Sequence, residues 1–161
     1  MIIVSNTSPI NNLAAIKQLE ILHELYDQVV IPEAVNRELT EATSPVAGAA
    51  EVRTLNWIET RRVSNRKAVE TLRIEVDEGE AEAIALALEL NATLLIIDES
   101  LGRTVASRLG IPITGLLGVL IEAKNQGLIL TVKPLLDDLI VKAGFWVAQP
   151  LYNRVLQTVG E

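Results

Sequence analysis

The chain has 161 residues, the size of one ordinary domain, and its 49% hydrophobic but only 3% aromatic content predicts an aliphatic buried core. It has no cysteine and one histidine, His23, which excludes disulfide scaffolds, thiolate zinc sites, cysteine nucleophiles and poly-histidine metal sites. The net charge of −7 excludes a general electrostatic binder of nucleic acid, and leaves a local basic patch or carboxylate-held metal ions as the routes to such binding.

The first 31 residues predict two strands and the helical region between them. Ile2–Val4 is a short apolar run typical of a buried strand. Ser8 before Pro9 predicts a helix N-cap followed by proline at the first helical position. Helical spacing runs from Ile10 to Leu25, and Val29–Ile31 predicts the second strand.

The middle of the chain is less regular. A helix is expected from about Glu33, a loop with a short helix after it at 43–50, and a short strand or edge segment at 57–60. Residues 61–73 carry five of the fourteen basic residues. This basic segment has two interpretations: it contacts an RNA backbone through phosphates, or it is the solvated face of an acidic protein.

The remaining sequence predicts two more strands, at Leu94–Ile97 and Ile111–Thr114. Helices are expected after Gly79, before Gly110, between Gly115 and Gly127, and at about 133–142 and 149–159.

Short aliphatic runs separated by helices indicate a parallel sheet covered on both faces. We therefore predict a three-layer α/β/α fold with a central, mostly parallel sheet of four to five strands. Residues 1–161 are expected to form a single domain with a helical C-terminal segment at about 131–161. No apolar run is long enough to cross a bilayer, and the N-terminus lacks the basic start of a signal peptide, so a cytoplasmic location is expected.

Polar side chains at the ends of the predicted strands are the first candidates for a site. Asn6 follows the first strand, Asp98 and Glu99 follow the Leu94–Ile97 strand, and Thr114 ends the last one. In an open parallel sheet, ligands bind outside the carboxyl ends of the strands. These residues are therefore expected to face a crevice.

Two helical glutamates can reach the same crevice. Glu80 lies beside Ile84 at the edge of an apolar stripe, and Glu38 lies beside Leu39 one turn after Val35. Carboxylate and amide oxygens suit Mg²⁺ or Mn²⁺ rather than zinc or copper.

Each of these residues also has a structural interpretation. Asp77 and Glu80 fit a capping box, in which Glu80 folds back and is not a ligand. Asn6 fits a turn, and Asp98 fits the N-cap of a helix from Ser100. Arg103 is expected either to bind a phosphate or to pair with an acidic neighbour. The structural interpretation of Glu78 and Glu82 is a solvated helix face, and that of Trp57 and Trp146 is packing in the interior.

Five segments together resemble the PIN-domain family in order and spacing. The first, Val4–Pro9, contains the opening Asn-Thr-Ser-Pro, and the second, Pro32–Leu39, contains a glutamate. The third, Gly79–Ala87, is a second acidic element; the fourth, Leu95–Glu99, has an aspartate at the end of a strand; and the fifth, Thr114–Leu120, begins with the closing Thr-Gly. The resemblance covers nearly the whole chain. The closing segment is similar to that of a bacterial and archaeal subgroup of predicted nucleic-acid-binding proteins.

The resemblance implies a metal-dependent ribonuclease that hydrolyses RNA phosphodiester bonds, often the toxin of a toxin–antitoxin pair. By position, Asn6, Glu38, Glu80 and Asp98 match the four residues that hold Mg²⁺ or Mn²⁺, and Glu99 is an auxiliary ligand. The implied partners are RNA, an antitoxin protein and a second copy in a homodimer. The candidate substrate contacts are Thr7, Ser8, Arg103 and Thr114.

Asn6 departs from the family pattern, which has an aspartate there. The four-residue cluster falls from a formal charge of −4 to −3, so weaker metal binding is expected. The alternative function is a non-catalytic PIN-like module that binds nucleic acid or protein through a degenerate metal site. An α/β domain unrelated to nucleic acid is the third interpretation.

Overall fold

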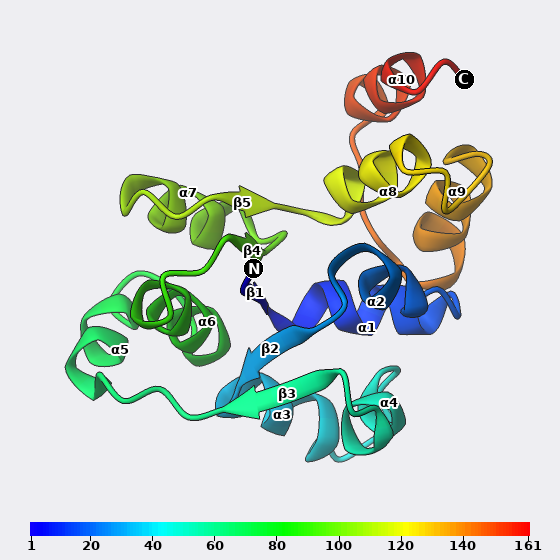
Figure 1. Ribbon diagram of the computed structural model, residues 1–161. Coiled ribbons are helices and arrows are strands. Elements are labelled where there is room, and N and C mark those ends of the chain that lie inside the picture. Colours follow the sequence, from blue (N-terminus) through cyan, green and yellow to red (C-terminus); the bar gives the residue numbers. More distant parts are fainter.

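The computed structural model describes residues 1–161 and contains one five-stranded sheet covered by helices on both faces (Figure 1). The strand order is β3-β2-β1-β4-β5, and every neighbouring pair is parallel. The predicted three-layer fold is therefore confirmed. The strands are β1 (Ile3–Ser5), β2 (Val29–Pro32), β3 (Ile58–Arg61), β4 (Leu94–Ile96) and β5 (Ile113–Thr114). The helices are α1 (Thr7–Ala15), α2 (Glu20–Tyr26), α3 (Glu33–Thr40), α4 (Ala49–Thr54), α5 (Arg66–Leu72), α6 (Glu78–Glu89), α7 (Ser100–Arg108), α8 (Leu116–Asn125), α9 (Lys133–Lys142) and α10 (Gln149–Thr158).

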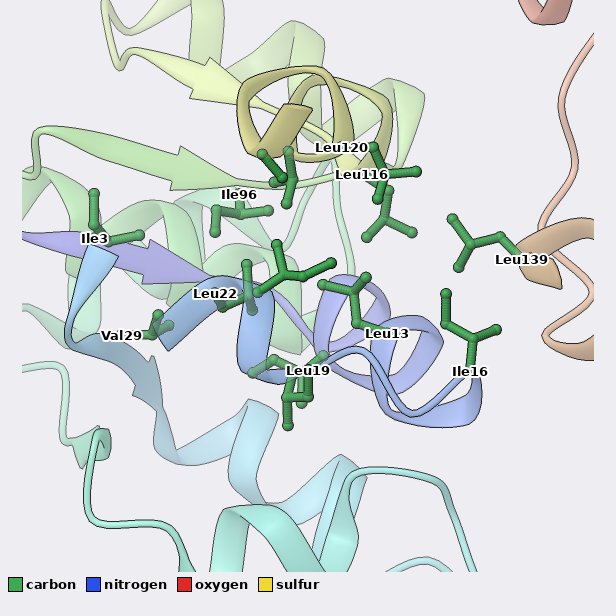
Figure 2. Packing of buried hydrophobic residues seen from close by; sticks show 14 of the residues in the cluster. Ile3, Leu13, Ile16, Leu19, Leu22, Val29, Ile96, Leu116, Leu120 and Leu139 are labelled. Atoms are coloured by element: carbon green, nitrogen blue, oxygen red, sulfur yellow. The ribbon is translucent and has the colours of Figure 1, made fainter. Parts of the chain in front are cut away.

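Alternate residues of the inner strands β1, β2 and β4 point into two separate cores. Ile3 and Ile96 belong to the core formed with α1, α2, α8 and α9, where they face Leu13, Leu22 and Leu116 (Figure 2). On the opposite face, residues such as Val4, Val30, Leu95 and Ile97 pack with α5, α6 and α7. Since both faces of the inner strands are covered, these strands do not alternate, and their only polar residue, Ser5, is buried as well.

The edge strand β3 has a different pattern. Only its first residue, Ile58, is buried, and Glu59, Thr60 and Arg61 are exposed. Charged side chains on an exposed edge discourage pairing with other chains. The edge assignment for 57–60 is therefore confirmed.

The first helical region differs from the prediction in two ways. The spacing from Ile10 to Leu25 covers two helices rather than one, because the chain turns at Lys17, whose φ is 59°. The first of them begins at Thr7, with Asn6 as its N-cap residue, so the prediction that Ser8 is the cap was wrong. Pro9 still lies in the first turn, where its missing N–H leaves no hydrogen bond unmade.

The end of the chain is held by one carboxylate. Glu161 accepts hydrogen bonds from the backbone N–H groups of Val132 (2.8 Å) and Lys133 (3.0 Å), and from Lys124 Nζ (2.9 Å). These donors lower the pKa of Glu161 from 4.5 to about 2. The carboxylate therefore fixes the start of α9 to the end of α8 and to the chain end.

We expect Glu161→Gln to lower the melting temperature, because the charge that these donors stabilise is lost. A lowered pKa contributes stability that is present above pH 4.5 and is lost as the pH falls toward 2. The difference in melting temperature between parent and variant should therefore shrink over that range, as followed by circular dichroism. A difference that grows on acidification would contradict this role.

None of the ten helices has both the length and the apolar character that crossing a bilayer requires.

Candidate functional site

Two strand ends lie side by side at the point where the order of the strands reverses. From β1 the chain moves outward through β2 to β3, and then returns to β4 on the other side of β1. Ser5 is in register with Ile96, and the backbone N–H of Asn6 donates to Ile96 O (3.0 Å). Asn6 and Asp98 therefore leave adjacent strands at the place where parallel sheets bind ligands.

Asn6 is buried (4% exposed) and its side chain does not cap α1. Its backbone is extended, with φ −80° and ψ 178°, so no turn requires an asparagine here. The interpretation of Asn6 as a turn residue therefore does not explain its side chain, and its carbonyl oxygen remains a candidate ligand.

Glu38 lies against the start of α6. Thr7 Oγ1 donates a hydrogen bond to Glu38 Oε2, and the other oxygen lies so close to Gly79 that a Cβ there would collide with it. Partial removal from water raises the pKa of Glu38, and Asp77 and Glu78 add to this, whereas the bond from Thr7 opposes it.

The contact with Gly79 leads to a prediction. Gly79→Ala should move the Glu38 carboxylate, because the new methyl group takes its place. In a helix, alanine is more stable than glycine by roughly 0.5–1 kcal/mol, so stability should hold or rise slightly while any activity that depends on Glu38 falls. Thermal melting and RNA cleavage assays on the same preparation check both halves. Unchanged cleavage would remove Glu38 from the site.

Glu80 is part of the capping box that the sequence predicted. Its Oε2 accepts from the Asp77 N–H (3.3 Å), and Asp77 Oδ1 accepts from the Glu80 N–H (2.8 Å). Burial raises the pKa of Glu80, and the charges of Asp77, Glu99 and Glu38 raise it further. Glu80 therefore has a structural role through one oxygen and also faces two other candidate carboxylates.

Asp98 does not cap α7, whose N-cap residue is Glu99 without a capping side chain. The Oδ1 atom of Asp98 accepts a hydrogen bond from the Leu116 N–H at the start of α8 (3.0 Å). The Oδ2 atom of Asp98 is buried and has no hydrogen-bond partner. Burial raises the pKa of Asp98, and the charge of Glu99 raises it further. The hydrogen bond from the Leu116 N–H and the charge of Arg103 lower the pKa and partly offset this rise. A buried carboxylate oxygen without a donor is costly unless a cation approaches it.

Arg103 comes from the first half of α7. Its Nη1 donates to Ile97 O (2.9 Å), and it lowers the pKa of Asp98 without a direct ion pair to it. The remaining candidate contacts lie around the same edge. Ser8 lies in the first turn of α1, and Thr114 ends β5 next to Gly115, whose Hα side faces Asp98 Oδ1.

The candidate carboxylates influence one another electrostatically. The charges of Glu38 and Glu99 raise the pKa of Glu80, and the charge of Glu99 raises the pKa of Asp98. As the side chains stand, no three acidic or histidine residues converge on a point where one ion could be held. The donors are all oxygens, one of them unpartnered, which is the chemistry that a hard divalent cation requires.

The prediction that Glu82 lies on a solvated face was wrong. Glu82 is 1% exposed and accepts from the Ala34 N–H (3.0 Å) at the start of α3 and from Arg66 (3.3 Å), with Arg37 at 3.8 Å. The signal was present in the sequence, because Ala81 and the run Ala83–Ala87 are apolar, and a helix that is apolar all round is buried. This carboxylate fixes α3, which carries Glu38, against α6, which carries Glu80.

The basic segment at 61–73 is largely paired. Arg61 binds Glu59, Arg62 lies 4.0 Å from Glu33, and Arg66 binds Glu82. Three of its five cations therefore have acidic partners within the chain.

The two tryptophans differ in environment. Trp57 is packed and stacks on His23, with ring centroids 5.0 Å apart, as expected for a core aromatic. Trp146 is 82% exposed, so its prediction as a packed residue was wrong. It lies in the segment between α9 and α10, where the fold leaves it open to solvent.

Comparison with known proteins agrees with the fold. A search of curated proteins finds no match. A family model described as a PIN domain matches residues 2–161. Since that match extends over all but the first residue, the chain belongs to the PIN-domain family.

Proposed function

We propose that this protein is a metal-dependent ribonuclease that hydrolyses RNA phosphodiester bonds. The PIN domain is a nuclease-type fold, and such domains generally use divalent metal ions. The single observation that carries the proposal is Asp98 Oδ2, a buried carboxylate oxygen with no partner at the switch point of the sheet.

In this proposal Asn6, Glu38, Glu80 and Asp98 hold Mg²⁺ or Mn²⁺, with Glu99 as an auxiliary ligand. When bound, such an ion supplies an activated water and positive charge for the leaving oxygen. The raised pKa values of Glu38, Glu80 and Asp98 support the assignment, because a cation relieves the burial and repulsion that raise them.

The other residues position the substrate. Arg103 offers a guanidinium beside Asp98, suited to a phosphate oxygen. Thr7, Ser8 and Thr114 border the same edge of the sheet and offer hydroxyl groups to the ribose-phosphate backbone.

Manganese titration tests the function. We expect RNA cleavage that saturates with Mn²⁺ and stops with EDTA. Asn6→Asp should shift the titration to lower Mn²⁺ concentration, because the fourth carboxylate restores a formal charge of −4. A calorimetric titration without RNA gives the metal affinity independently. Absence of any saturable Mn²⁺ binding by either form would contradict the proposal.

A second candidate is a binding module without catalysis. Asn6 is neutral, and Glu38 and Glu80 each use one oxygen within the protein, on Thr7 and Asp77. In that case RNA binds equally well with and without metal, and Asn6→Asp gains no cleavage.

The resemblance also supports wider proposals. We propose that residues 1–161 act as one cytoplasmic domain, that the protein forms a homodimer, and that an antitoxin protein inhibits it. Light scattering of the purified chain tests whether it is a homodimer. Growth arrest on expression, relieved by the product of a neighbouring gene, tests inhibition by an antitoxin.

A further inference from the structure

We infer that the protein has a base-binding subsite beside Asp98, in which Trp146 stacks on one unpaired base of a single-stranded nucleic acid and Arg103 and Arg154 bind the adjoining phosphate. The inference deepens the proposed ribonuclease function and depends on it for the identity of the bound polymer. It is carried by a cavity, an exposed indole and two unpaired guanidinium groups.

The cavity has a volume of about 580 Å³ and lies between the end of β5, one side of α8 and the segment 145–158. Asp98, Arg103 and Thr114 line its polar side, and Trp146 and Arg154 line the side formed by the C-terminal segment. This volume is in the range of small-ligand sites and accommodates one nucleotide. The cavity therefore begins at the proposed catalytic carboxylate and extends away from it.

A second cavity, of about 310 Å³, adjoins the first. It is lined by Ser8 and Asn12 from α1, and it shares Asp98 and Trp146 with the first cavity. The indole thus borders the spaces on both sides of Asp98. A strand bound in either cavity therefore lies beside both Asp98 and Trp146.

Trp146 has no partner within the protein that accounts for its position. It is 82% exposed, whereas the other tryptophan is 6% exposed and stacked on His23. Aromatic side chains beside a nucleic-acid path stack on bases of any sequence, because every base has a π-face. A stacked base would cover the indole that the fold leaves open.

The charges in the cavity also favour a phosphate. Eight of the fourteen basic residues form ion pairs with acidic side chains. Of the six that do not, Arg103 and Arg154 line this one cavity. In a protein of net charge −7, two unpaired guanidinium groups opposite a single carboxylate, Asp98, mark a place for an anion.

These features select a single strand. In a duplex the bases are stacked on each other, so a protein aromatic reaches them only in unpaired regions. The apolar wall of the cavity, which includes Leu117 and Ile121 of α8, suits a base and a ribose rather than two paired backbones.

Binding is measured in EDTA, where no cleavage occurs. The probe is a short oligoadenylate RNA labelled with fluorescein, followed by anisotropy. We expect Trp146→Ala to weaken binding about tenfold and Arg154→Gln to weaken it several-fold. Lys17→Gln is the control, because Lys17 also forms no ion pair and is exposed but lies outside both the cavity and the basic segment 61–73, and it should bind like the parent.

A second readout reports on the indole itself. In a Trp57→Phe background Trp146 is the only tryptophan, and the unlabelled oligoadenylate should quench its fluorescence in a saturable way. The same sequence annealed to oligouridylate should quench far less. The anisotropy series uses the parent background, so it still decides the question if Trp57→Phe, a core substitution, does not fold.

Each outcome separates the subsite from the function. Equal affinity of the parent and Trp146→Ala, or equal binding of the duplex, would overturn the subsite even if Mn²⁺-dependent cleavage is observed. Quenching and weakened binding without any cleavage by the parent would support the subsite and contradict the nuclease function. If Trp146→Ala changes only the oligomeric state, the indole serves a protein contact and the inference is wrong.

Discussion

Asp98→Asn is expected to lower the rate of Mn²⁺-dependent RNA cleavage by about 10²- to 10³-fold, the usual cost of removing one group that stabilises the transition state. The substitution replaces one carboxylate oxygen by an N–H₂ group, which cannot bind a cation. The other oxygen can still accept from the Leu116 N–H, so the start of α8 stays in place. The measurement is kcat/KM on a labelled RNA, with thermal melting to show that the fold is kept.

Asp138→Asn provides the matched control. Asp138 is a surface carboxylate paired with Lys142 on α9, away from the strand ends. It should cleave RNA at the parent rate. If a folded Asp98→Asn protein also cleaves at that rate, the assignment of the site is wrong.

Glu82→Leu is expected to lower the free energy of unfolding by about 3 kcal/mol, near the lower end of the cost of breaking a buried charge pair. The side chain is 1% exposed, and its loss leaves the Ala34 N–H without an acceptor in the interior. The cost is kept near this lower end because Arg37 and Arg66 are each 46% exposed and can turn to water. Urea unfolding at neutral pH measures the difference.

Glu78→Gln is the control for this stability prediction. Glu78 lies one turn before Glu82 on the same helix and also pairs with Arg37, but its side chain is 43% exposed. An exposed pair of this kind contributes about 0–1 kcal/mol, so the variant should unfold almost like the parent. Equal effects of the two substitutions would show that burial does not set the value of the Glu82 interactions.

Cleavage by Glu82→Leu is informative as well. Glu82 touches no candidate ligand, but it holds α3 against α6, the helices that carry Glu38 and Glu80. We expect activity to fall at temperatures where the variant is still folded, because the two carboxylates are then less well positioned.

Much of the candidate site could be predicted from order along the chain. The rule that ligands bind at strand ends predicts Asn6 and Asp98 from the sequence, and the strand order places both at the reversal point. The rule works because parallel strands all end at one edge of the sheet, so position in the sequence implies position in space. The capping box at Asp77 and Glu80 was predictable for a similar reason, since its two partners are three residues apart.

The environment of a side chain was harder to predict. Glu82 was expected in solvent and is buried, and Trp146 was expected in the core and is exposed. The neighbours of Glu82 come from elements distant in sequence, and the exposure of Trp146 depends on how the C-terminal elements pack. Arg66 and Ala34 contact Glu82, and Trp146 lies in the segment between α9 and α10, where it is exposed.

The sequence by itself determined the strands, most of the helices and the parallel sheet, because hydrophobic periodicity and capping act over a few residues. Only the tertiary structure decided which oxygen of Asp98 lacks a partner, which glutamate is enclosed by arginines and which tryptophan faces the cavity. Those properties depend on burial and on hydrogen-bond partners supplied by other elements. Pairing and exclusion from water are set by packing across the whole chain, and no local pattern encodes them.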